Sequence, residues 1–372
     1  MKKKKVAFLI ESFLVGGAEK VLVDIVNHLD PEKFDITVIS VFNYSVYKDY
    51  DKQFDRPLPE YVHFKTLVNN HIRLLYILFN FLLVRIPNFL FHLLVREHYD
   101  TLVAFYEGLP TYWVGKLNPS STKRIAWLHT TTELSQGTSN EAVLNEQFHL
   151  YKNYDQIVAV SKAAAQSFAD TFGLSTTVIY NPIDIHAVQE KSLEVNQHPL
   201  FQHRTVFISV GRITPCKGYD RAIDIALTLK KRGCDFIWGI IGGGDTSDLE
   251  KMINFHSLNE HVQFLGHQSN PYSYIRKADL FLSTSYVEGL GMSLIEALAI
   301  GTPVISSNFQ AAYEILGKNQ YGTICSSNEE FADAIESFLK DPAPFAERIA
   351  VGQKQAESFS TEHQLKKIEE IL

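Results

Sequence analysis

The chain has 372 residues, of which 45% are hydrophobic and 21% are charged. This balance excludes an intrinsically disordered chain, and the length predicts two domains. The net charge of −7 gives no reason to expect nucleic acid as a partner.

The N-terminus begins with a lysine run at residues 2–5, followed by an apolar stretch at 6–10. A secretory signal needs a longer apolar region, and this stretch ends at Glu11. It therefore predicts a buried first strand and a cytoplasmic protein. The three cysteines, Cys216, Cys234 and Cys325, form no CxxC pair, which favours a reduced compartment without a disulfide framework or zinc site.

Short apolar runs alternate with helical patterns along the whole chain, which predicts βαβ units, parallel sheets and the α/β class. Helices are expected, for example, at 18–29 and 163–172. The polar, patternless stretch 190–199 is interpreted as the interdomain linker. Strands are expected at 6–11, 35–41, 101–105, 125–129, 156–161 and 176–180, and in the second half at 206–210, 236–241, 262–265, 280–283 and 303–306.

The segment 72–95 is apolar on nearly every face. Arg85, Pro87 and His92 interrupt it, and Pro87 should break a helix just before it. Two interpretations stay open: a pair of helices buried in the first domain, or a monotopic surface that dips into an anionic membrane with help from nearby arginines and the run 2–5. A true membrane span fits least well.

The densest signal lies at 285–305, where the pattern reads strand, glycine turn, helix, glycine stop, proline and strand. Gly301 predicts a left-handed helix end, and Pro303 prevents continuation. Gly289 and Gly291 allow a tight turn at the carboxyl end of a strand, and the following helix should aim its free N–H groups at an anion such as a phosphate.

Two carboxylates accompany this turn. Glu288 lies in the turn itself and Glu296 lies about one turn into the helix, which is expected to begin near Met292. Carboxylates accept hydrogen bonds from sugar hydroxyls, whereas backbone N–H groups and cations bind phosphates. Because ligands of open α/β sheets bind at this end of the strands, the pattern favours a binding site over two solvated surface charges.

A second loop follows the strand expected at 206–210. It contains Arg212 and Lys217 among Gly211, Pro215 and Gly218. Parallel strands end at one sheet edge, so these cations should lie near the acidic turn. There they would neutralise a diphosphate and stabilise its departure.

The first half offers two weaker candidates. Gly16 and Gly17 follow the first strand and open a helix, but the full GxGxxG spacing is missing and no acidic residue for a nicotinamide ribose is evident. His129 ends the strand 125–129, again at a carboxyl end. Because the GxGxxG spacing and the acidic residue are missing after the first strand, a nicotinamide oxidoreductase is disfavoured.

Together these motifs resemble the family-four retaining glycosyltransferases of the GT-B fold, including bacterial capsule and exopolysaccharide enzymes. The resemblance covers nearly the whole chain. It rests on the segments 16–19, 127–129, 158–161, 180–184, 211–212 with 217–218, and the E-x7-E motif from Glu288 to Glu296.

The resemblance implies two Rossmann-like domains facing across a cleft: an acceptor-side domain 1–184, on which the helix 361–372 packs back, and a nucleotide-sugar domain 185–360. It also implies hexose transfer with retention from a nucleotide sugar, UDP-linked by family frequency, to a glycan or lipid-linked acceptor, with no metal or other cofactor. The alternatives are a GT-B epimerase or phosphorylase and a non-catalytic scaffold subunit.

The resemblance also implies residue roles. Arg212 and Lys217 would hold the diphosphate, Glu296 the ribose, and Glu288 the transferred sugar, while His129 would contact this sugar from the other domain. The expected catalytic residues are thus His129 and Glu288. Donor-binding backbone groups are expected at Gly16, Gly17, Gly289, Leu290 and Gly291.

The sequence departs from the family pattern at two places. Gly291 stands where many relatives carry proline, and the segment 310–314 lacks the glycine-rich form common before the last Glu-Ile-Leu. Both departures concern the shape of the sugar pocket rather than the diphosphate site.

Overall fold

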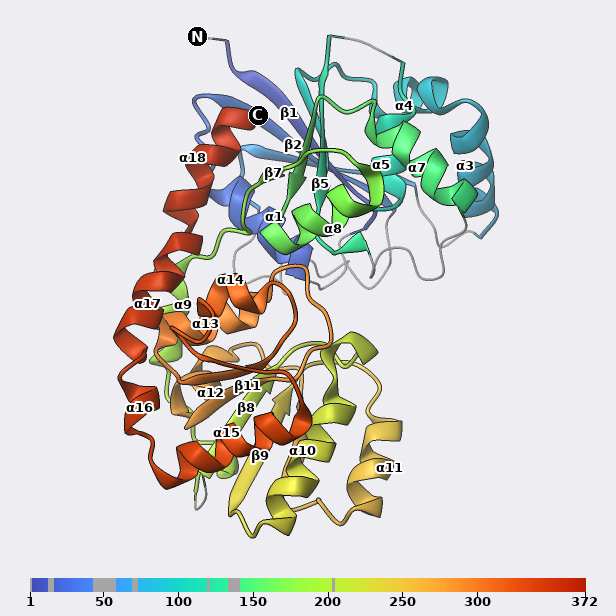
Figure 1. Cartoon of the computed structure of the whole chain (residues 1–372). Coiled ribbons are helices and arrows are strands. Elements are labelled where there is room, and N and C mark those ends of the chain that lie inside the picture. The colour runs from blue at the N-terminus through green and yellow to red at the C-terminus, as the bar shows by residue number, and fades with distance from the viewer. Residues whose placement is uncertain are drawn as a thin grey trace. The chain divides into compact units, whose positions relative to one another are not determined.

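The computed structural model of the chain describes residues 2–12, 17–42, 58–68, 73–118, 121–132, 141–202 and 205–372. The chain forms two compact units, each built on its own parallel sheet (Figure 1). The first unit comprises residues 1–182 together with 361–372, and the second comprises residues 183–360. The predicted α/β class with two Rossmann-like domains is confirmed, and the observed division precedes the predicted one by two residues.

The first unit contains a seven-stranded sheet with the order β3-β2-β1-β4-β5-β6-β7. All its strand pairs are parallel, so connecting helices pack on the sheet. Its elements are β1 (Lys4–Ile10), α1 (Gly17–His28), β2 (Phe34–Phe42), β3 (Val62–Val68), α3 (Arg73–Arg85), α4 (Pro87–Val95), β4 (Thr101–Ala104), α5 (Leu109–Gly115), β5 (Lys123–Leu128), α7 (Glu141–Tyr151), β6 (Gln156–Ala159), α8 (Lys162–Phe172), β7 (Thr177–Val178) and the C-terminal α18 (Thr361–Ile371).

The second unit repeats this plan with six parallel strands in the order β10-β9-β8-β11-β12-β13. Its elements are α9 (Ile185–Ser192), η2 (Pro199–Phe201), β8 (Thr205–Val210), η3 (Pro215–Lys217), α10 (Tyr219–Lys231), β9 (Phe236–Ile241), α11 (Ser247–Phe255), β10 (Val262–Gly266), α12 (Tyr272–Lys277), β11 (Leu280–Ser283), α13 (Met292–Ile300), β12 (Val304–Ser307), α14 (Ala312–Leu316), β13 (Thr323–Cys325), α15 (Asn328–Lys340), α16 (Ala343–Ala346), α17 (Ile349–Ala356) and η4 (Glu357–Phe359).

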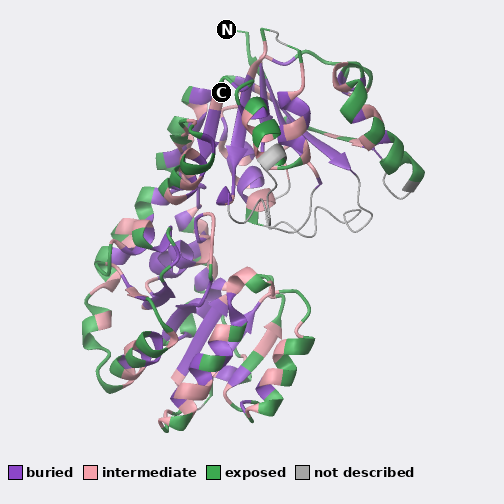
Figure 2. Ribbon diagram, turned by 45° about the vertical axis from the view of Figure 1, so that its right-hand side comes forward, coloured by how far each residue is buried: buried purple, intermediate pink, exposed green. Residues whose placement is uncertain are grey.

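Each sheet has a point at which the strand order reverses. In the first unit it lies between β1 and β4, and in the second between β8 and β11. In open α/β sheets this reversal opens a crevice outside the carboxyl ends of the strands, because the two connections leave toward opposite faces. The central strands on both sides are buried along nearly their whole length, as Figure 2 shows.

The C-terminal helix α18 belongs to the first unit. Lys33 Nζ lies 2.8 Å from Glu369 Oε2, and the Thr101 hydroxyl donates a 2.6 Å hydrogen bond to the carbonyl of Leu372. Ile368 and Leu372 are fully buried. Burial of these side chains attaches the helix to a sheet that precedes it by more than 200 residues in sequence.

The apolar segment forms two helices separated at Ile86, and Pro87 begins the second one, so the break falls just before the proline as predicted. Their inner face contributes Phe79 and Leu83 of α3, with Leu90 and Phe91 of α4, to the core of the first unit. Their outer side exposes large apolar side chains: Leu74 is 71% exposed, Val84 63% and Phe89 62%. Of the helices that the structure describes, none combines the length and the apolar character that a membrane span requires.

The predicted linker is wrong. The division between the units falls after Pro182, and residues 190–199 lie within the second unit. Asn196 fixes part of this stretch, because its Nδ2 lies 3.3 Å from Ser273 Oγ and its carbonyl accepts a 2.6 Å hydrogen bond from Lys277 Nζ. The stretch begins in the last turn of α9, and after Ser192 it is a loop held on α12 by side-chain hydrogen bonds.

Candidate functional site

Two loops at the reversal point of the second sheet are tied to each other by their backbones. Tyr286 N donates a 2.8 Å hydrogen bond to the carbonyl of Cys216, and the Thr284 hydroxyl donates to the carbonyl of Lys217 at 3.1 Å. Gly218 has φ +61°, and a Cβ there would lie 2.2 Å from the Thr284 carbonyl oxygen. Only glycine permits this close approach, which brings the loop after β8 against the turn after β11.

The closest charged contact in these loops joins Lys217 to Glu288. Lys217 Nζ lies 2.6 Å from Glu288 Oε1, and their side chains are 20% and 15% exposed. The Ser285 hydroxyl donates to the same oxygen at 2.7 Å. The structure therefore brings together the predicted cation and the predicted carboxylate, and it adds Ser285, which the sequence analysis did not single out.

Arg212 begins the same loop and is exposed. Its neighbour Gly211 lies under the Lys217 side chain, because a Cβ at Gly211 would be 2.9 Å from Lys217 Cε. Among the described residues, no hydrogen bond or ion pair engages the Arg212 guanidinium. Two cations thus border one loop, one of them held by Glu288 and the other open to solvent.

Helix α13 begins at Met292, where the sequence predicts it. Gly291 at its N-cap has φ +99°, a left-handed conformation that proline cannot adopt, and it offers no side chain to cap the helix. The first-turn N–H groups are therefore left without a side-chain acceptor of the helix's own. The helix ends at Gly301 with φ +88°, which confirms the predicted left-handed stop.

The second predicted carboxylate, Glu296, lies on α13 and is only 7% exposed. Its Oε1 accepts a 3.1 Å hydrogen bond from the hydroxyl of Tyr272, the first residue of α12. No sequence pattern points to Tyr272, because a single tyrosine at a helix start is not distinctive. Glu288 and Glu296 are thus held by different partners. Of the turn residues between them, Leu290 is buried and Gly289 is half-buried.

In the first unit, Gly17 starts α1, whereas Gly16 lies outside the described residues. His129 follows β5 and is 9% exposed. Its ring centroid lies 4.6 Å from that of Phe105 and 6.0 Å from that of Tyr106. Burial lowers the pKa of His129 to about 3, so the imidazole is neutral at physiological pH.

Glu107 lies beside His129 and was not anticipated from the sequence. Its Oε1 accepts hydrogen bonds from the backbone N–H of His129 and of Thr130, both at 2.8 Å, and from the Thr130 hydroxyl at 3.0 Å. Burial raises the pKa of this carboxyl. The sequence pattern that singles out His129 also applies to Glu107, because both residues lie at or just after the carboxyl end of a predicted strand.

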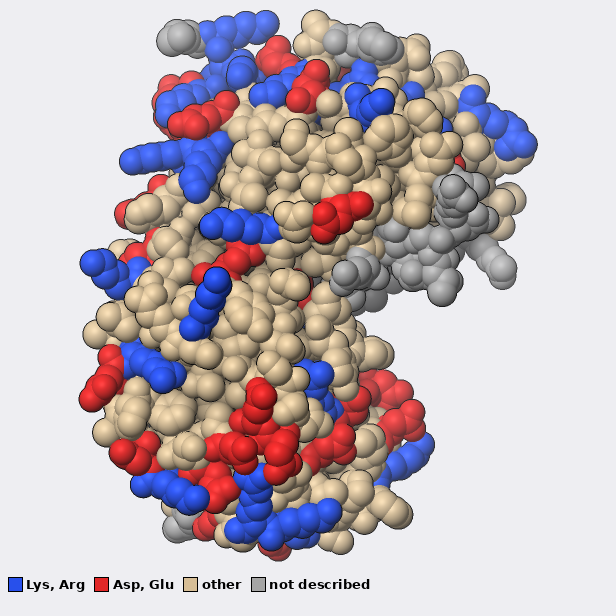
Figure 3. All heavy atoms as spheres, in the orientation of Figure 1, with Lys and Arg blue, Asp and Glu red and all other residues tan. Residues whose placement is uncertain are grey.

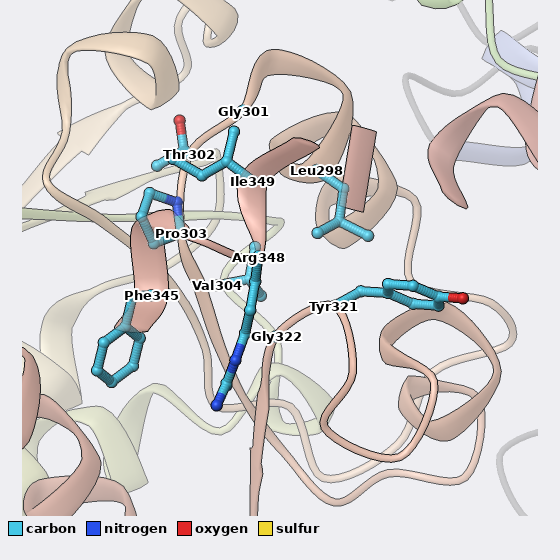
Figure 4. A pocket seen from close by; sticks show the side chains of 10 residues that line it. All are labelled: Leu298, Gly301, Thr302, Pro303, Val304, Tyr321, Gly322, Phe345, Arg348 and Ile349. Carbon is cyan, nitrogen blue, oxygen red and sulfur yellow. The ribbon is translucent and has the colours of Figure 1, made fainter. Parts of the chain in front are cut away.

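A further pocket is lined by residues from the start of β12 and from the α16–α17 region (Figure 4). Pro303 and Val304 lie at the amino end of β12, opposite the edge that carries Glu288. Arg348 is its only charged lining residue, and this side chain donates a 3.0 Å hydrogen bond to Thr323 Oγ1. The pocket is therefore separate from the candidate site and lacks comparable chemistry.

Comparison with known families assigns both halves of the chain. Residues 15–187 match the model of Glycosyltransferase Family 4, and residues 190–356 match that of Glycosyl transferases group 1. The chain belongs to the group 1 glycosyltransferases of the family-four type. The two matches meet near the division between the structural units, so each unit of this glycosyltransferase corresponds to one family model.

Curated relatives agree with this assignment. An uncharacterized glycosyltransferase of Methanocaldococcus jannaschii is 26% identical over 58% of this chain and 55% of its own length. An N-acetylgalactosamine-N,N'-diacetylbacillosaminyl-diphospho-undecaprenol 4-alpha-N-acetylgalactosaminyltransferase of Campylobacter jejuni is 29% identical over 52% and 53%. The match thus spans about half the length of these two relatives. An uncharacterized glycosyltransferase of Haemophilus influenzae is 21% identical over 96% and 97%.

Solved structures show the same fold over the whole chain. Anabaena HepE in complex with UDP and glucose superposes with a TM-score of 0.80 at 21% identity, covering 99% of this chain and 98% of that one. Sucrose-phosphate synthase from Thermosynechococcus elongatus gives 0.79 at 16% identity, with 99% and 98% covered. The glycosyltransferase therefore has the GT-B fold.

Proposed function

We propose that this glycosyltransferase moves a hexose from a UDP-linked donor, with retention, onto a glycan or lipid-linked acceptor in cell-surface polysaccharide or glycoconjugate synthesis. One observation carries the proposal: Lys217 and Glu288 pair at 2.6 Å at the carboxyl edge of the second sheet, where the strand order reverses. A cation, an uncapped helix start and two carboxylates at such an edge suit a diphosphate that carries sugars.

The donor's groups divide among these residues by charge. Lys217 and Arg212 bind the diphosphate together with backbone N–H groups at Leu290 and Gly291, because these groups are cations and donors. Glu296 accepts from the ribose hydroxyls and Glu288 from the transferred hexose. In the first unit, we assign phosphate contacts to the backbone at Gly17 and a hexose contact to the neutral imidazole of His129.

Names of similar proteins support the choice of donor and acceptor. The Anabaena structure contains UDP and glucose, and the Campylobacter relative is named for an undecaprenol-linked acceptor and an alpha linkage. We extend a UDP donor, a lipid-linked or glycan acceptor and retention to this chain on that basis.

The chemistry needs charge stabilisation more than proton transfer by a side chain. Arg212 and Lys217 stabilise the negative charge that develops on the departing diphosphate. Glu288 stabilises positive charge near the anomeric carbon. In a front-face substitution the leaving phosphate oxygen takes the acceptor's proton as the new glycosidic bond forms on the same face. No metal is part of this scheme.

The test is transfer by the purified chain. It is incubated with a panel of UDP-, GDP- and dTDP-hexoses and with undecaprenyl-diphosphate-linked acceptors, and the product's anomeric configuration is read by NMR. Lys217→Ala should abolish transfer while the melting temperature is kept. Glu296→Ala should also abolish transfer, with a lower melting temperature but a folded chain, because the Tyr272 hydroxyl loses its acceptor. Normal transfer by both variants contradicts the site assignment. An epimerised nucleotide sugar, or a requirement for inorganic phosphate, indicates an epimerase or phosphorylase instead.

The exposed side of α3 and α4 supports a second proposal, that the first unit binds the cytoplasmic face of an anionic membrane. This side is mostly uncharged, with Lys or Arg toward its rim (Figure 3). Leu74, Phe81 and Phe89 are each at least half exposed, and the Arg85 guanidinium lies 3.7 Å from the Phe81 ring centroid. Residues 73–96 contain no acidic residue, so anionic lipid headgroups meet no repulsion.

Vesicle sedimentation tests this proposal. The chain should sediment with phosphatidylglycerol vesicles at low salt and much less with phosphatidylcholine vesicles. The triple variant Leu74→Ser, Phe81→Ser, Phe89→Ser should stay in the supernatant, whereas Phe255→Ser, which changes an 84% exposed side chain of the second unit, should sediment normally. Wild-type protein that remains in the supernatant at low salt contradicts the proposal.

A further inference from the structure

Several buried polar atoms after β4 and β5 have no hydrogen-bond partner among the described residues. They are Glu107 Oε2, both ring nitrogens of His129, and Thr131 Oγ1. A buried polar group without a partner is costly, and buried groups in native proteins are nearly always paired. Such atoms at the reversal-point edge of the first sheet point to a ligand that supplies the missing bonds.

The two oxygens of Glu107 differ in their surroundings. Oε1 accepts three hydrogen bonds, all from His129 and Thr130. This oxygen fixes the turn after β5 against the segment after β4, and with it the backbone that carries the imidazole. Oε2 is buried yet makes no such bond, so it is available to an incoming donor.

The chemistry of this cluster selects its ligand. A neutral imidazole offers one donor and one acceptor, and Glu107 Oε2 offers an acceptor. The described contacts of Glu107 and His129 include no lysine or arginine, so a phosphate would meet a carboxyl group without a compensating cation. A hydroxyl both donates and accepts, and adjacent hydroxyls of a sugar can satisfy Oε2 and the ring nitrogens together.

We propose that Glu107 positions the turn carrying His129 through Oε1 and binds a sugar hydroxyl through Oε2. This proposal rests on the glycosyltransferase function argued above and adds a residue to it. The hydroxyl belongs to a sugar, either the hexose of the donor or the acceptor glycan, since both present the same groups. Glu107 thereby links backbone positioning and sugar recognition in one side chain.

Two substitutions separate these tasks. In Glu107→Gln the amide oxygen still accepts from His129 and Thr130, while an NH₂ group replaces Oε2. In Glu107→Ala both functions are lost. Hydrogen exchange at the amides of His129 and Thr130 should therefore stay slow in E107Q and accelerate in E107A. Glu60→Gln, an exposed carboxylate of the same unit, serves as the matched control and should behave as wild type.

Binding and kinetics complete the test. In E107Q, the affinity for UDP should stay within twofold of wild type, because UDP has no hexose, while kcat/KM for transfer should fall about 10-fold to 100-fold. Weaker binding of the UDP-hexose and slower hydrolysis of it assign the hydroxyl to the donor. Unchanged hydrolysis with a raised KM for the acceptor assigns it to the acceptor.

The proposal is overturned if E107Q retains wild-type kcat/KM, or if UDP binding falls as much as UDP-hexose binding. It is also overturned if the His129 and Thr130 amides exchange equally in wild type and E107A. Failure of the proposed function looks different, because wild-type protein would then transfer no sugar from any donor of the panel.

Discussion

Lys217 Nζ lies 2.6 Å from Glu288 Oε1, so a cation expected to bind a diphosphate is paired with a carboxylate expected to bind a sugar. The alkyl end of the Lys217 side chain also lies against Gly211, which precedes the exposed Arg212. A phosphate that approaches Lys217 has to share or displace the carboxylate. This competition makes the two residues energetically coupled.

The coupling predicts opposite effects on binding and turnover. Glu288→Gln removes the competing charge and should raise the affinity for UDP by roughly 3-fold to 10-fold, or about 1 kcal/mol. The same variant should lose sugar transfer, because the carboxylate near the anomeric carbon is gone. Titration calorimetry with UDP measures the first effect and a transfer assay the second.

Lys217→Ala is the complementary control and should weaken UDP binding by about 10-fold or more, since a charge-assisted contact is lost. Weaker UDP binding in Glu288→Gln would show that Glu288 supports the nucleotide instead of competing with it.

A second prediction concerns the glycine at the start of α13. Gly291→Ala should destabilise the second unit by about 1 to 2 kcal/mol, because an L residue is strained at φ +99°. The new Cβ would also lie 3.1 Å from Phe309 Cζ. Since the change distorts the N-terminus of the helix, UDP affinity should fall as well. Thermal melting and calorimetry measure the two effects.

Gly301→Ala is a matched control at the other end of the same helix. Its φ is +88°, so the backbone strain is similar, and its Cβ would meet the flexible end of Gln353 at 2.9 Å. Stability should fall here too, but UDP affinity should be kept. Equal losses of UDP affinity in both variants would mean that α13 affects binding only through overall stability.

A third prediction concerns the support of Glu296. Tyr272→Phe removes the hydroxyl that donates to Glu296 Oε1 at 3.1 Å and leaves the ring in place. Because Glu296 is buried, loss of this hydrogen bond should cost about 1 to 2 kcal/mol of stability and weaken UDP binding several-fold. Tyr274→Phe, on the same helix, removes a hydroxyl that contacts Gln268 and should leave UDP binding unchanged. An unaffected UDP affinity in Tyr272→Phe contradicts this support role.

The parts of the fold that sequence predicted well are those with strong local signals. Long buried strands such as β1 and β8, and the glycine-bounded helix α13, follow directly from apolar runs and turn residues. Two strands were not anticipated, β3 and β13, and both are sheet edges. β3 mixes apolar and polar residues and is mostly exposed or half-buried, and β13 has three residues, so neither carries a distinct period.

The site was predictable to a similar degree. Lys217 and Glu288 were expected together because parallel strands end at a common edge. Tyr272 and Glu107 were not anticipated, since their roles depend on contacts to residues 24 and 22 positions away that no local pattern encodes. The conformation of Gly291 explains a departure noted in the sequence: with φ +99°, this turn has a backbone that proline could not reproduce.

A last prediction concerns the pH dependence that the buried His129 gives to the stability of the first unit. The pKa of His129 is about 3 in the folded chain against an ordinary value of 6.5, so the unfolded chain binds a proton first as pH falls. The contribution of this neutral imidazole to the free energy of unfolding is fully present above pH 6.5. It is lost progressively as pH falls from 6.5 toward 3. The expected slope is up to about 1.4 kcal/mol per pH unit.

His129→Phe removes this titration while keeping an aromatic ring against Phe105. Urea unfolding of the first unit, followed by the fluorescence of the buried Trp113 and Trp127, should show the stability of wild type falling relative to that of the variant as pH drops from 7 to 4.5. The carboxylates titrate in both proteins, so their contribution cancels in the difference between the two unfolding free energies. Parallel pH profiles would mean that the imidazole is protonated at its ordinary pKa, and a neutral hydroxyl-binding histidine would then be untenable.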